Sequence, residues 1–264
     1  MISEVLDCRI CGSKVGHCFD GKALKRYPFT MLSCSSCGFL YIDKPFWLEE
    51  AYADAISDLD TGLVSRNIQL SNSLRPLLYY LFGENGSFVD IAGGTGLLVR
   101  LMRDAGLDFY WHDEFCKNIH ARGFEFIAGI KQYQAITAFE VFEHLVDPAA
   151  FLTKTLSSTH AEVIIFTTEL LSNPVPKPDE WWYYSFETGQ HISFYQEKSL
   201  QKLAERMNLQ FITDGYMHFF CREHYLDAIN KYLNSTILKK IMQYKANRTL
   251  ESKTMADRSY LLGS

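Results

Sequence analysis

The pattern of hydrophobic and polar residues divides the middle of the chain into short elements of two alternating kinds. Apolar runs that suit buried strands recur near residues 88–92, 108–113, 124–128, 134–139 and 162–168. Stretches with helical spacing lie between them, near 96–105, 115–121 and 147–158. After a further helix near 197–207, runs near 209–216 and 217–222 are typical of an antiparallel hairpin at a sheet edge. The alternation predicts an α/β fold, doubly wound around a mostly parallel, seven-stranded sheet.

Helical patterns also flank this region on both sides. Trp47, Leu48, Ala51, Tyr52 and Ile56 recur at helical spacing, and a second helix is expected from about Val64 to Phe82, with Pro76 bending it or marking a late start. Near the end, residues 225–244 form an amphipathic pattern, and from Lys231 onward seven basic residues face two acidic ones. Packing on the core or a homodimer contact is the commonest role of such a helix. The last dozen residues are expected to be mobile.

Composition narrows the classes of protein that need to be considered. The chain has 264 residues, of which 47% are hydrophobic, and a net charge of −5 with a pI near 5.9. This acidity argues against a broad nucleic-acid footprint. The start, MISEVLDCRICG, does not resemble a signal peptide, and no apolar run is long enough to span a membrane. Seven cysteines, four of them in C-x-x-C pairs, point to a reducing compartment, so a cytoplasmic protein is expected.

The cysteine pairs predict a metal site near the N-terminus. Cys8 and Cys11 are followed after 22 residues by Cys34 and Cys37, and a glycine trails each pair. Four thiolates at this spacing suit a structural Zn²⁺, whereas a catalytic zinc needs an open position. His17 is a conceivable substitute ligand, and four cysteines without metal are the alternative. Residues 1–45 are therefore expected to form a small zinc-ribbon-like module.

A nucleotide-type cofactor site is predicted at residues 88–96, which read FVDIAGGTG. An apolar strand empties into glycines and a helix begins at once, so bare backbone and free N–H groups can meet a ligand. Asp113, 20 residues beyond Gly93, ends the next apolar run, where an acid accepts hydrogen bonds from ribose hydroxyls. Val99 stands where a dinucleotide fingerprint needs its third glycine. A glycine-rich turn that binds nothing is the alternative.

With Asp90 before the glycines, the stretch resembles the first motif, (D/E)-x-G-x-G-x-G, of S-adenosylmethionine methyltransferases of the Rossmann-like class, except that Ala92 stands at the first glycine. The resemblance implies S-adenosylmethionine as cofactor and a Rossmann-like domain over residues 46–222, followed by a C-terminal helix and tail over 223–264. Its implied cofactor-binding residues are Asp90, Ala92, Gly93, Gly94, Gly96 and Asp113.

A polar cluster follows the predicted fourth strand, and the stretch AFEVFEHLVDP resembles the E-V-x-E-H-x-x-D-P segment of many small-molecule methyltransferases. By that resemblance Glu140 lies near the cofactor, whereas Glu143 and His144 lie near the methyl acceptor. Asp147 is expected to cap the next helix. A structural histidine bonded to a loop carbonyl is an equally good interpretation of His144.

The stretch from Glu169 to Tyr195 is unusually rich in aromatic residues and contains the sequence WWYYSFETGQHISFY. Flat amphipathic rings stack on sugars or bases, which makes Glu169, Trp181, Tyr184 and Gln190 candidate substrate-binding residues. The segment resembles the G-Q-H-I-x-F/Y region of methyltransferases encoded beside sugar and cell-envelope pathways. His191 is the favoured general base and His144 the other candidate, with Glu143 available to assist. A lid that packs on the zinc module is the alternative role of the aromatic residues.

These resemblances imply methyl transfer to a small-molecule acceptor, a hydroxyl or carbon of a sugar, nucleotide sugar or envelope glycan precursor. Sugar C-methyltransferases also begin with a four-cysteine region, but they carry a further C-terminal domain. The alternatives are an RNA base methyltransferase that uses the zinc module for RNA contact and a catalytically inactive, cofactor-binding interaction protein. Residues 1–230 hold 19 basic and 29 acidic side chains, a balance that disfavours RNA.

Overall fold

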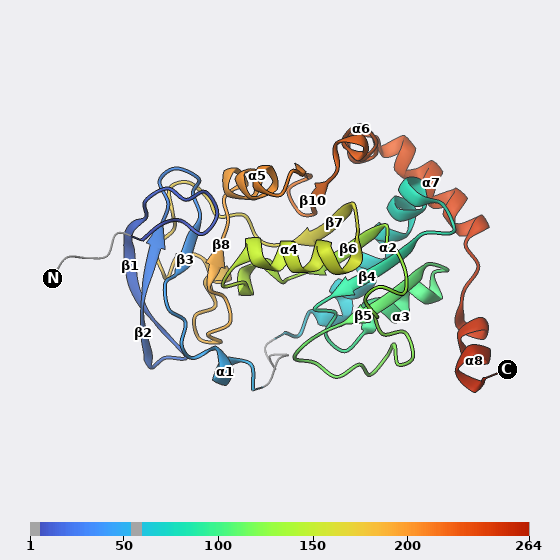
Figure 1. Ribbon diagram of the computed structural model, residues 1–264, viewed down its shortest axis with the longest axis horizontal. Coiled ribbons are helices and arrows are strands. Elements are labelled where there is room, and N and C mark those ends of the chain that lie inside the picture. Colours follow the sequence, from blue (N-terminus) through green and yellow to red (C-terminus); the bar gives the residue numbers. More distant parts are fainter. Residues whose placement is uncertain (1–5, 54–59, 264) are drawn as a thin grey trace. The chain divides into compact units, whose positions relative to one another are not determined.

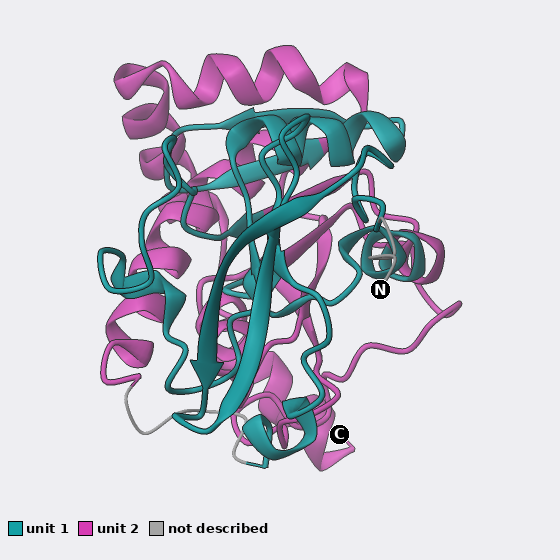
Figure 2. Cartoon of the chain, turned by 90° about the vertical axis from the view of Figure 1, so that its left-hand side faces the viewer, with its two compact units in different colours: residues 1–57, 139–155, 166–220 teal, residues 58–138, 156–165, 221–264 magenta. Residues whose placement is uncertain are grey.

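The computed structural model describes residues 6–53 and 60–263, so Ile56 of the first predicted helix lies outside the described residues. The chain divides into two compact units, each built from several stretches of sequence (Figure 2). Unit 1 comprises residues 1–57, 139–155 and 166–220, and unit 2 comprises residues 58–138, 156–165 and 221–264. Among the described residues, no helix combines the length and apolar character needed to cross a membrane.

Unit 1 begins with a four-stranded antiparallel sheet that is completed by a distant part of the chain. Its order is β1-β2-β3-β8, with β1 at Gly16–Ala23, β2 at Tyr27–Ser33, β3 at Leu40–Ile42 and β8 at Ser193–Phe194 (Figure 1). Leu40 pairs with Phe194 in the register between β3 and β8. One face of this sheet packs on a buried cluster that includes Trp47, Tyr184 and Ile192. The cysteine-bearing ribbon thus shares one hydrophobic core with the aromatic segment.

The second sheet has six strands in the order β5-β4-β6-β7-β10-β9. Their bounds are Ser87–Ile91 for β4, Asp108–His112 for β5, Ala135–Phe139 for β6, Val163–Thr167 for β7, Gln210–Thr213 for β9 and His218–Cys221 for β10. β4 is parallel to both β5 and β6, as the apolar runs predict, and β9 is the edge strand expected of the closing hairpin.

The predicted strand at 124–128 is the difference between seven strands and six. Glu125 makes only a single bridge, to Trp111 of β5. The carboxylate of Glu125 accepts hydrogen bonds from the Gly123 N–H and from the Asn118 side chain. Two backbone hydrogen bonds, from the Trp111 N–H to the Phe124 carbonyl and from the Phe126 N–H to the Trp111 carbonyl, form the bridge. A turn follows at residues 128–130, so the pairing with β5 does not continue.

The helices follow the predicted pattern with two exceptions. Unit 2 holds α2 and α3 before the sheet's second strand and α6 to α8 after its last, and further helices and 3-10 turns lie along the rest of the chain. Their bounds are Leu48–Ala51 (α1), Leu63–Phe82 (α2), Leu97–Asp104 (α3), Phe142–His144 (η1), Pro148–Thr159 (α4), Trp182–Tyr184 (η2), Glu197–Arg206 (α5), Glu223–Tyr225 (η3), Leu226–Leu233 (α6), Thr236–Thr249 (α7) and Thr254–Leu262 (α8). Pro76 lies inside α2, so it does not mark a late start.

The first exception is the helix expected at 115–121, which is wrong. The backbone N–H groups of Phe115 and Cys116 bond to Asp113 Oδ1, and those of Ile119 and His120 bond to the carbonyl of Thr95. The bonds to Asp113 are compatible with a helix start, but the Ile119 and His120 N–H groups are taken by the Thr95 carbonyl and cannot make intrahelical bonds, so the segment forms an irregular loop in place of a helix.

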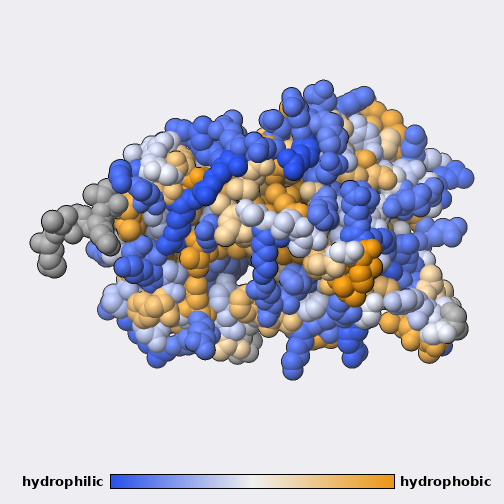
Figure 3. All heavy atoms as spheres, viewed as in Figure 1, coloured by the Kyte–Doolittle hydropathy of each residue, from blue (hydrophilic) through white to orange (hydrophobic). Residues whose placement is uncertain are grey.

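The second exception is the tail, which the sequence predicts to be mobile. Residues 254–262 instead form α8, whose Asp257 is buried and accepts two hydrogen bonds from the guanidinium of Arg103 in α3. Hydrophobic side chains gather over α8 on the face drawn in Figure 3, where Met255, Tyr260, Leu261 and Leu262 are exposed. The buried Asp257, paired with Arg103 and Arg100, therefore anchors a helix whose other side chains are largely in solvent.

Candidate functional site

The four paired cysteines of unit 1 come together in one cluster. The sulfur atoms of Cys8 and Cys37 are 3.6 Å apart and those of Cys11 and Cys34 are 3.5 Å apart, and all four lie within 4.8 Å of one another. Tetrahedral zinc with bonds of about 2.3 Å separates its sulfur ligands by about 3.8 Å. The geometry therefore fits a four-thiolate ion, and His17, which bonds to Asp20 on the surface, is not part of the cluster.

Local backbone geometry explains how each C-x-x-C pair is shaped. The Gly12 N–H donates to the carbonyl of Cys8, and the Gly38 N–H donates to that of Cys34. Both glycines have φ above +70°, a left-handed conformation in which a Cβ is disfavoured. The close contact with Cys37 lowers the pKa of the Cys8 thiol to about 5. The Cys8 thiol can therefore lose its proton readily when a metal cation binds its sulfur.

In unit 2, β4 ends in the glycine turn, and the three glycines have different roles. A Cβ on Gly93 would meet the Asp90 carboxylate at 2.8 Å, and one on Gly96 would meet the Asn118 amide oxygen at 2.9 Å. A Cβ on Gly94 would meet nothing within 4 Å. Gly93 and Gly96 are thus required for packing, whereas Gly94 faces open space at the start of α3. Ala92, at the motif's first glycine, has a φ of +55°, which strains a residue with a side chain.

Asp113 closes onto this turn from the end of β5. Its Oδ2 accepts a hydrogen bond of 2.9 Å from the Gly94 N–H, and its Oδ1 accepts bonds of 2.7 Å from the N–H groups of Phe115 and Cys116. The acid predicted to bind a ribose therefore lies against the glycine turn, as expected of the predicted nucleotide-type cofactor site.

Asp90 is buried in the middle of β4, with 4% of its surface exposed. Burial raises the pKa of this carboxyl to about 7, and the charge of Asp113 adds to the shift. The hydroxyl of Thr137 in β6 donates to Asp90 at 2.6 Å and opposes it. This side chain supports the turn from below, since its other oxygen lies against Gly93.

Glu140 lies in unit 1, directly after β6, and is held in a strained conformation with a φ of +55°. The hydroxyl of Thr167, at the end of β7, donates to its carboxylate at 2.6 Å and accepts from its N–H at 3.2 Å. Strain of this kind persists where the surrounding structure determines it and is frequent at functional sites.

Unit 1 also brings together Glu143, His144 and His191, the three predicted catalytic residues. One ligating atom from each lies within 4.8 Å of the others, and the two imidazole rings are 4.9 Å apart. Glu143 is fully buried, and neither carboxylate oxygen has a hydrogen-bond partner among the described residues. His144 and His191 are each partly accessible. The cluster is therefore closed behind the acid and open beside the imidazoles.

Burial shifts the pKa values of Glu143 and His144 in opposite directions. Burial raises the pKa of Glu143, while the nearby His191 and the hydroxyls of Tyr183 and Thr168 oppose that shift. Burial lowers the pKa of His144 to about 3, and the second imidazole adds to the effect. His144 is consequently neutral at physiological pH and a poor proton acceptor, although its lone pair can still bind another cation.

The residues predicted to bind substrate are distributed over different surroundings. Tyr184 is 1% exposed, donates to the carbonyl of Pro176 and stacks on Phe186, so it belongs to the core. Trp181 is partly buried against Tyr184 and Phe194. This packing against the ribbon corresponds to the alternative role of the aromatic residues, a lid on the zinc module. Of the four residues 181–184, Trp182 is the one with an exposed ring, at 78% exposure.

Gln190 and Glu169 likewise differ in burial. Gln190 is buried, donates to the carbonyl of Ala51 and offers its own carbonyl to His144, so it positions that ring. Glu169 is exposed and lies two residues after the end of β7. The sequence analysis did not identify Thr137, Thr167 or Tyr183, which support Asp90, Glu140 and His191. Their hydroxyls and carbonyl act through partners that only the folded chain supplies.

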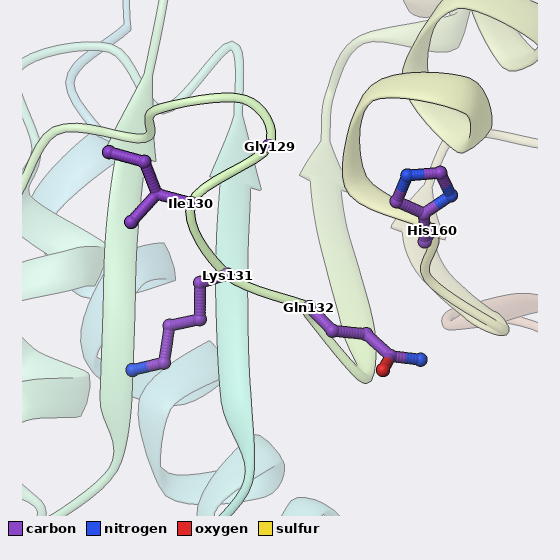
Figure 4. Close-up of a pocket in the computed structure, with 5 residues that line it drawn as sticks. All are labelled: Gly129, Ile130, Lys131, Gln132 and His160. Carbon is purple, nitrogen blue, oxygen red and sulfur yellow. The ribbon is translucent and has the colours of Figure 1, made fainter.

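A surface hollow lies apart from these groups within unit 2. Gly129, Ile130, Lys131, Gln132 and His160 line it (Figure 4). Lys131 points away from His160 in that view and is engaged with Asp108 and with the hydroxyl of Tyr110. With its cation already paired, the hollow contains no predicted site residue.

Several solved structures are similar to this chain. Magnesium protoporphyrin IX methyltransferase from Synechocystis, with bound SAM, is 14% identical with a TM-score of 0.41, over 68% of this chain and 93% of that one. The plantazolicin methyltransferase BpumL, in complex with SAH, is 12% identical with a TM-score of 0.43, over 68% and 97%. An O-methyltransferase family 2 protein from Planctomyces limnophilus, in complex with apigenin, is 14% identical with a TM-score of 0.43, over 65% and 64%. At these values the similarities carry no information on the substrate of this chain.

The comparison with curated proteins gave no match. A family model described as a methyltransferase domain matches residues 66–214, which is more than half of the chain. This range begins in α2 and ends after β9, and it includes the glycine turn, Asp113 and the acid–histidine cluster. The chain belongs to the methyltransferase domain family.

Proposed function

We propose that the protein transfers the methyl group of S-adenosylmethionine to a small-molecule acceptor, namely a hydroxyl or carbon of a sugar, nucleotide sugar or envelope glycan precursor. The observation that carries the proposal is the glycine turn after β4, where Gly94 leaves open space beside the start of α3 and Asp113 lies 2.9 Å from its N–H. A glycine turn with an acid beside it in this way can bind the ribose and the amino-acid moiety of a nucleoside cofactor.

The residues of the turn fit that cofactor. Asp113 would exchange its bond from Gly94 for bonds from the ribose hydroxyls, and the freed N–H would face the ligand. Asp90 would keep the turn in place through Gly93. When bound, the cofactor supplies a methyl group activated by a sulfonium, and the protein has to align the acceptor behind it.

Acceptor activation is assigned to the acid–histidine cluster of unit 1. The Nε2 atoms of His191 and His144 make no hydrogen bond among the described residues, so both face the cluster with a lone pair. The low pKa of His144 makes that ring the weaker base of the two candidates for taking the proton of a hydroxyl as the new bond forms. We favour His191, which is more closely surrounded by the aromatic segment through its ring contact with Tyr183. The sugar class rests on the resemblance of residues 189–194 to envelope-pathway methyltransferases.

The four thiolates are assigned a structural Zn²⁺ that stabilises the ribbon and supplies no chemistry to the reaction. Two observations support this: the sulfur spacings of 3.5 and 3.6 Å, and the presence of four protein ligands, which leave no open position. The ribbon carries β3, and β3 pairs with β8 two residues beyond His191. Zinc would therefore also steady the segment that bears the favoured base.

The first test is a calorimetric titration of the whole protein with S-adenosylmethionine and S-adenosylhomocysteine, comparing Gly94→Ala with Gly129→Ala. Both glycines have positive φ and open space around the added Cβ, so both variants carry the same backbone penalty. Only Gly94→Ala should lose affinity, by at least about tenfold. Equal affinity in both variants, or no binding by the wild type, would refute the cofactor assignment.

The second test measures transfer of labelled methyl to nucleotide sugars and to RNA. His191→Asn keeps a donor for the Tyr183 carbonyl and removes Nε2, whereas the exposed His17→Asn is the matched control. Label in sugar that falls by about a hundredfold in His191→Asn alone supports the assignment of the base. Label found only in RNA would contradict the acceptor class.

A further inference from the structure

Glu143 is the most unusual charged group in unit 1, because it is 0% exposed and both carboxylate oxygens lack a hydrogen-bond partner among the described residues. An ionised carboxylate without a partner is costly to bury, and such groups in proteins are normally paired or coordinate a metal. Its neighbours are the imidazoles of His144 and His191 and the hydroxyls of Tyr183 and Thr168, none of which carries a permanent positive charge. The position therefore offers a negative charge and two nitrogen lone pairs to a missing cation.

The orientation of both rings is fixed by backbone carbonyls. His144 Nδ1 lies 3.1 Å from the carbonyl of Gln190, and His191 Nδ1 lies 2.7 Å from that of Tyr183. Because a carbonyl can only accept, Nδ1 carries the hydrogen in each ring, and the lone pair is on Nε2. Metal-binding histidines are held in this way, with the second nitrogen donating to a carbonyl or carboxylate.

A fully buried histidine of the same unit, His218, provides the contrast. His218 uses both ring nitrogens, since Nε2 lies 2.9 Å from the carbonyl of Thr168 and Nδ1 lies 2.7 Å from the hydroxyl of Thr213. That ring is fully committed to structure. His144 and His191 are committed on one side only, and their uncommitted sides meet at Glu143.

Backbone bonds also fix the distance between the segments that supply the three side chains. The Ile192 N–H donates to the carbonyl of Glu143 at 2.8 Å, so the residue after His191 is tied to the residue before His144. The hydroxyl of Tyr195 donates to the carbonyl of Phe142, and that of Ser193 to the carbonyl of Leu145. The cluster is consequently preorganised and does not depend on flexible side chains meeting by chance.

We propose that Glu143, His144 and His191 bind a divalent first-row transition-metal ion, at a second site distinct from the four thiolates. Two imidazoles and one carboxylate are ligands that Zn²⁺, Fe²⁺ and Mn²⁺ accept, and three protein ligands leave coordination positions open. The open side is the partly accessible side of the histidines. An oxygen ligand such as an alcohol or a vicinal diol can enter there.

This inference deepens the proposed function, and for its role in turnover it rests on that function. A hydroxyl acceptor bound to the ion would have a lowered pKa and would release its proton to solvent. Its oxygen would then take the methyl group from the sulfonium sulfur, which leaves as a neutral thioether, and the two histidines would hold the ion in place of removing the proton themselves. Binding of the ion, however, is measured without any methyl donor or acceptor. Failure of the metal site and failure of the methyl transfer proposal can therefore be told apart.

The test starts from whole protein that carries one equivalent of Zn²⁺, which the thiolates take first, and titrates it calorimetrically with Zn²⁺, Co²⁺ and Mn²⁺. The variants are Glu143→Gln, which keeps the shape of the acid, and His144→Asn and His191→Asn, which keep the donors to the two carbonyls. His17→Asn is the control, because that ring is exposed and bonds only to Asp20.

Wild type and His17→Asn should each bind one further ion, and each of the other three variants should bind it at least about tenfold more weakly. Metal analysis should then count two ions per wild-type chain and one per chain of Cys11→Ser. No second ion in the wild type, or equal affinity in Glu143→Gln with native circular dichroism, would overturn the proposal. A variant that fails to fold is replaced in this comparison by Glu143→Asp, which retains the charge but shortens the reach.

Discussion

Two regions of the molecule bury a carboxylate almost completely and treat it in opposite ways. Asp257 in α8 is 4% exposed and lies 2.6 Å from one nitrogen of Arg103 and 2.9 Å from Arg100. Glu143 in η1 is 0% exposed, and within residues 6–53 and 60–263 no cationic side chain bonds to it. The ionic neighbours of Asp257 hold its pKa below the ordinary value, whereas burial raises that of Glu143. The first charge serves the fold, and the second is left for a ligand.

The largest expected effect tests the structural half of this comparison. Arg103→Ala should lower the free energy of unfolding by about 5 kcal/mol, because it leaves the buried Asp257 with Arg100 alone and also removes a guanidinium 3.7 Å from the ring of Phe124. Urea denaturation of the whole chain measures the loss. The double variant Arg103→Met, Asp257→Leu should recover most of it, since a buried ion pair can be replaced by apolar packing.

Asp90 offers an intermediate case, because it is as buried as Asp257 but its partner is only a hydroxyl. Its pKa rises from an ordinary 3.8 to about 7, so the folded state holds a proton that the unfolded state has lost. Stability from this group is fully present below pH 4 and disappears as the pH rises through about 7. The total change is on the order of 4 kcal/mol. Asp90→Asn should remove this pH dependence of the unfolding free energy; an unchanged slope would show that Asp90 is ionised throughout.

Glu143→Gln tests the other half of the comparison. In protein that holds zinc only at the thiolates, the change removes an unpaired buried charge and should raise the free energy of unfolding by about 1–2 kcal/mol. Thermal unfolding, with Glu49→Gln as an exposed control, measures the gain. If the variant instead loses stability as Arg103→Ala does, Glu143 has a structural partner and the contrast with Asp257 fails.

The sequence reveals those parts of these regions that depend on local spacing. The cysteine pairs and the glycine turn could be predicted, because each is a short loop whose geometry its own residues determine. Glu143 and His144 also stood out, but their distance from His191 depends on the bond from Ile192 to the Glu143 carbonyl, which no local pattern encodes. The same holds for α8, whose Asp257 finds its partners, Arg103 and Arg100, in the distant helix α3. The loop at 115–121 has a helical pattern, yet the Thr95 carbonyl accepts the hydrogen bonds of the Ile119 and His120 N–H groups, which a helix would use internally.

The smallest expected effect extends the comparison from unpaired charge to backbone strain. Ala92, at the first glycine position of the cofactor turn, and Lys25, in the hairpin turn between β1 and β2, are non-glycine residues with φ of +55° and +60°. Ala92→Gly and Lys25→Gly should each relieve the left-handed conformation and raise the free energy of unfolding by about 0.5–1 kcal/mol. Calorimetry with S-adenosylmethionine then separates the two sites. If Ala92→Gly alone changes the affinity for S-adenosylmethionine, the strain at Ala92 lies where the ligand binds. If neither variant changes the affinity, the strain at Ala92 has no more function than the strain at Lys25 in the exposed hairpin.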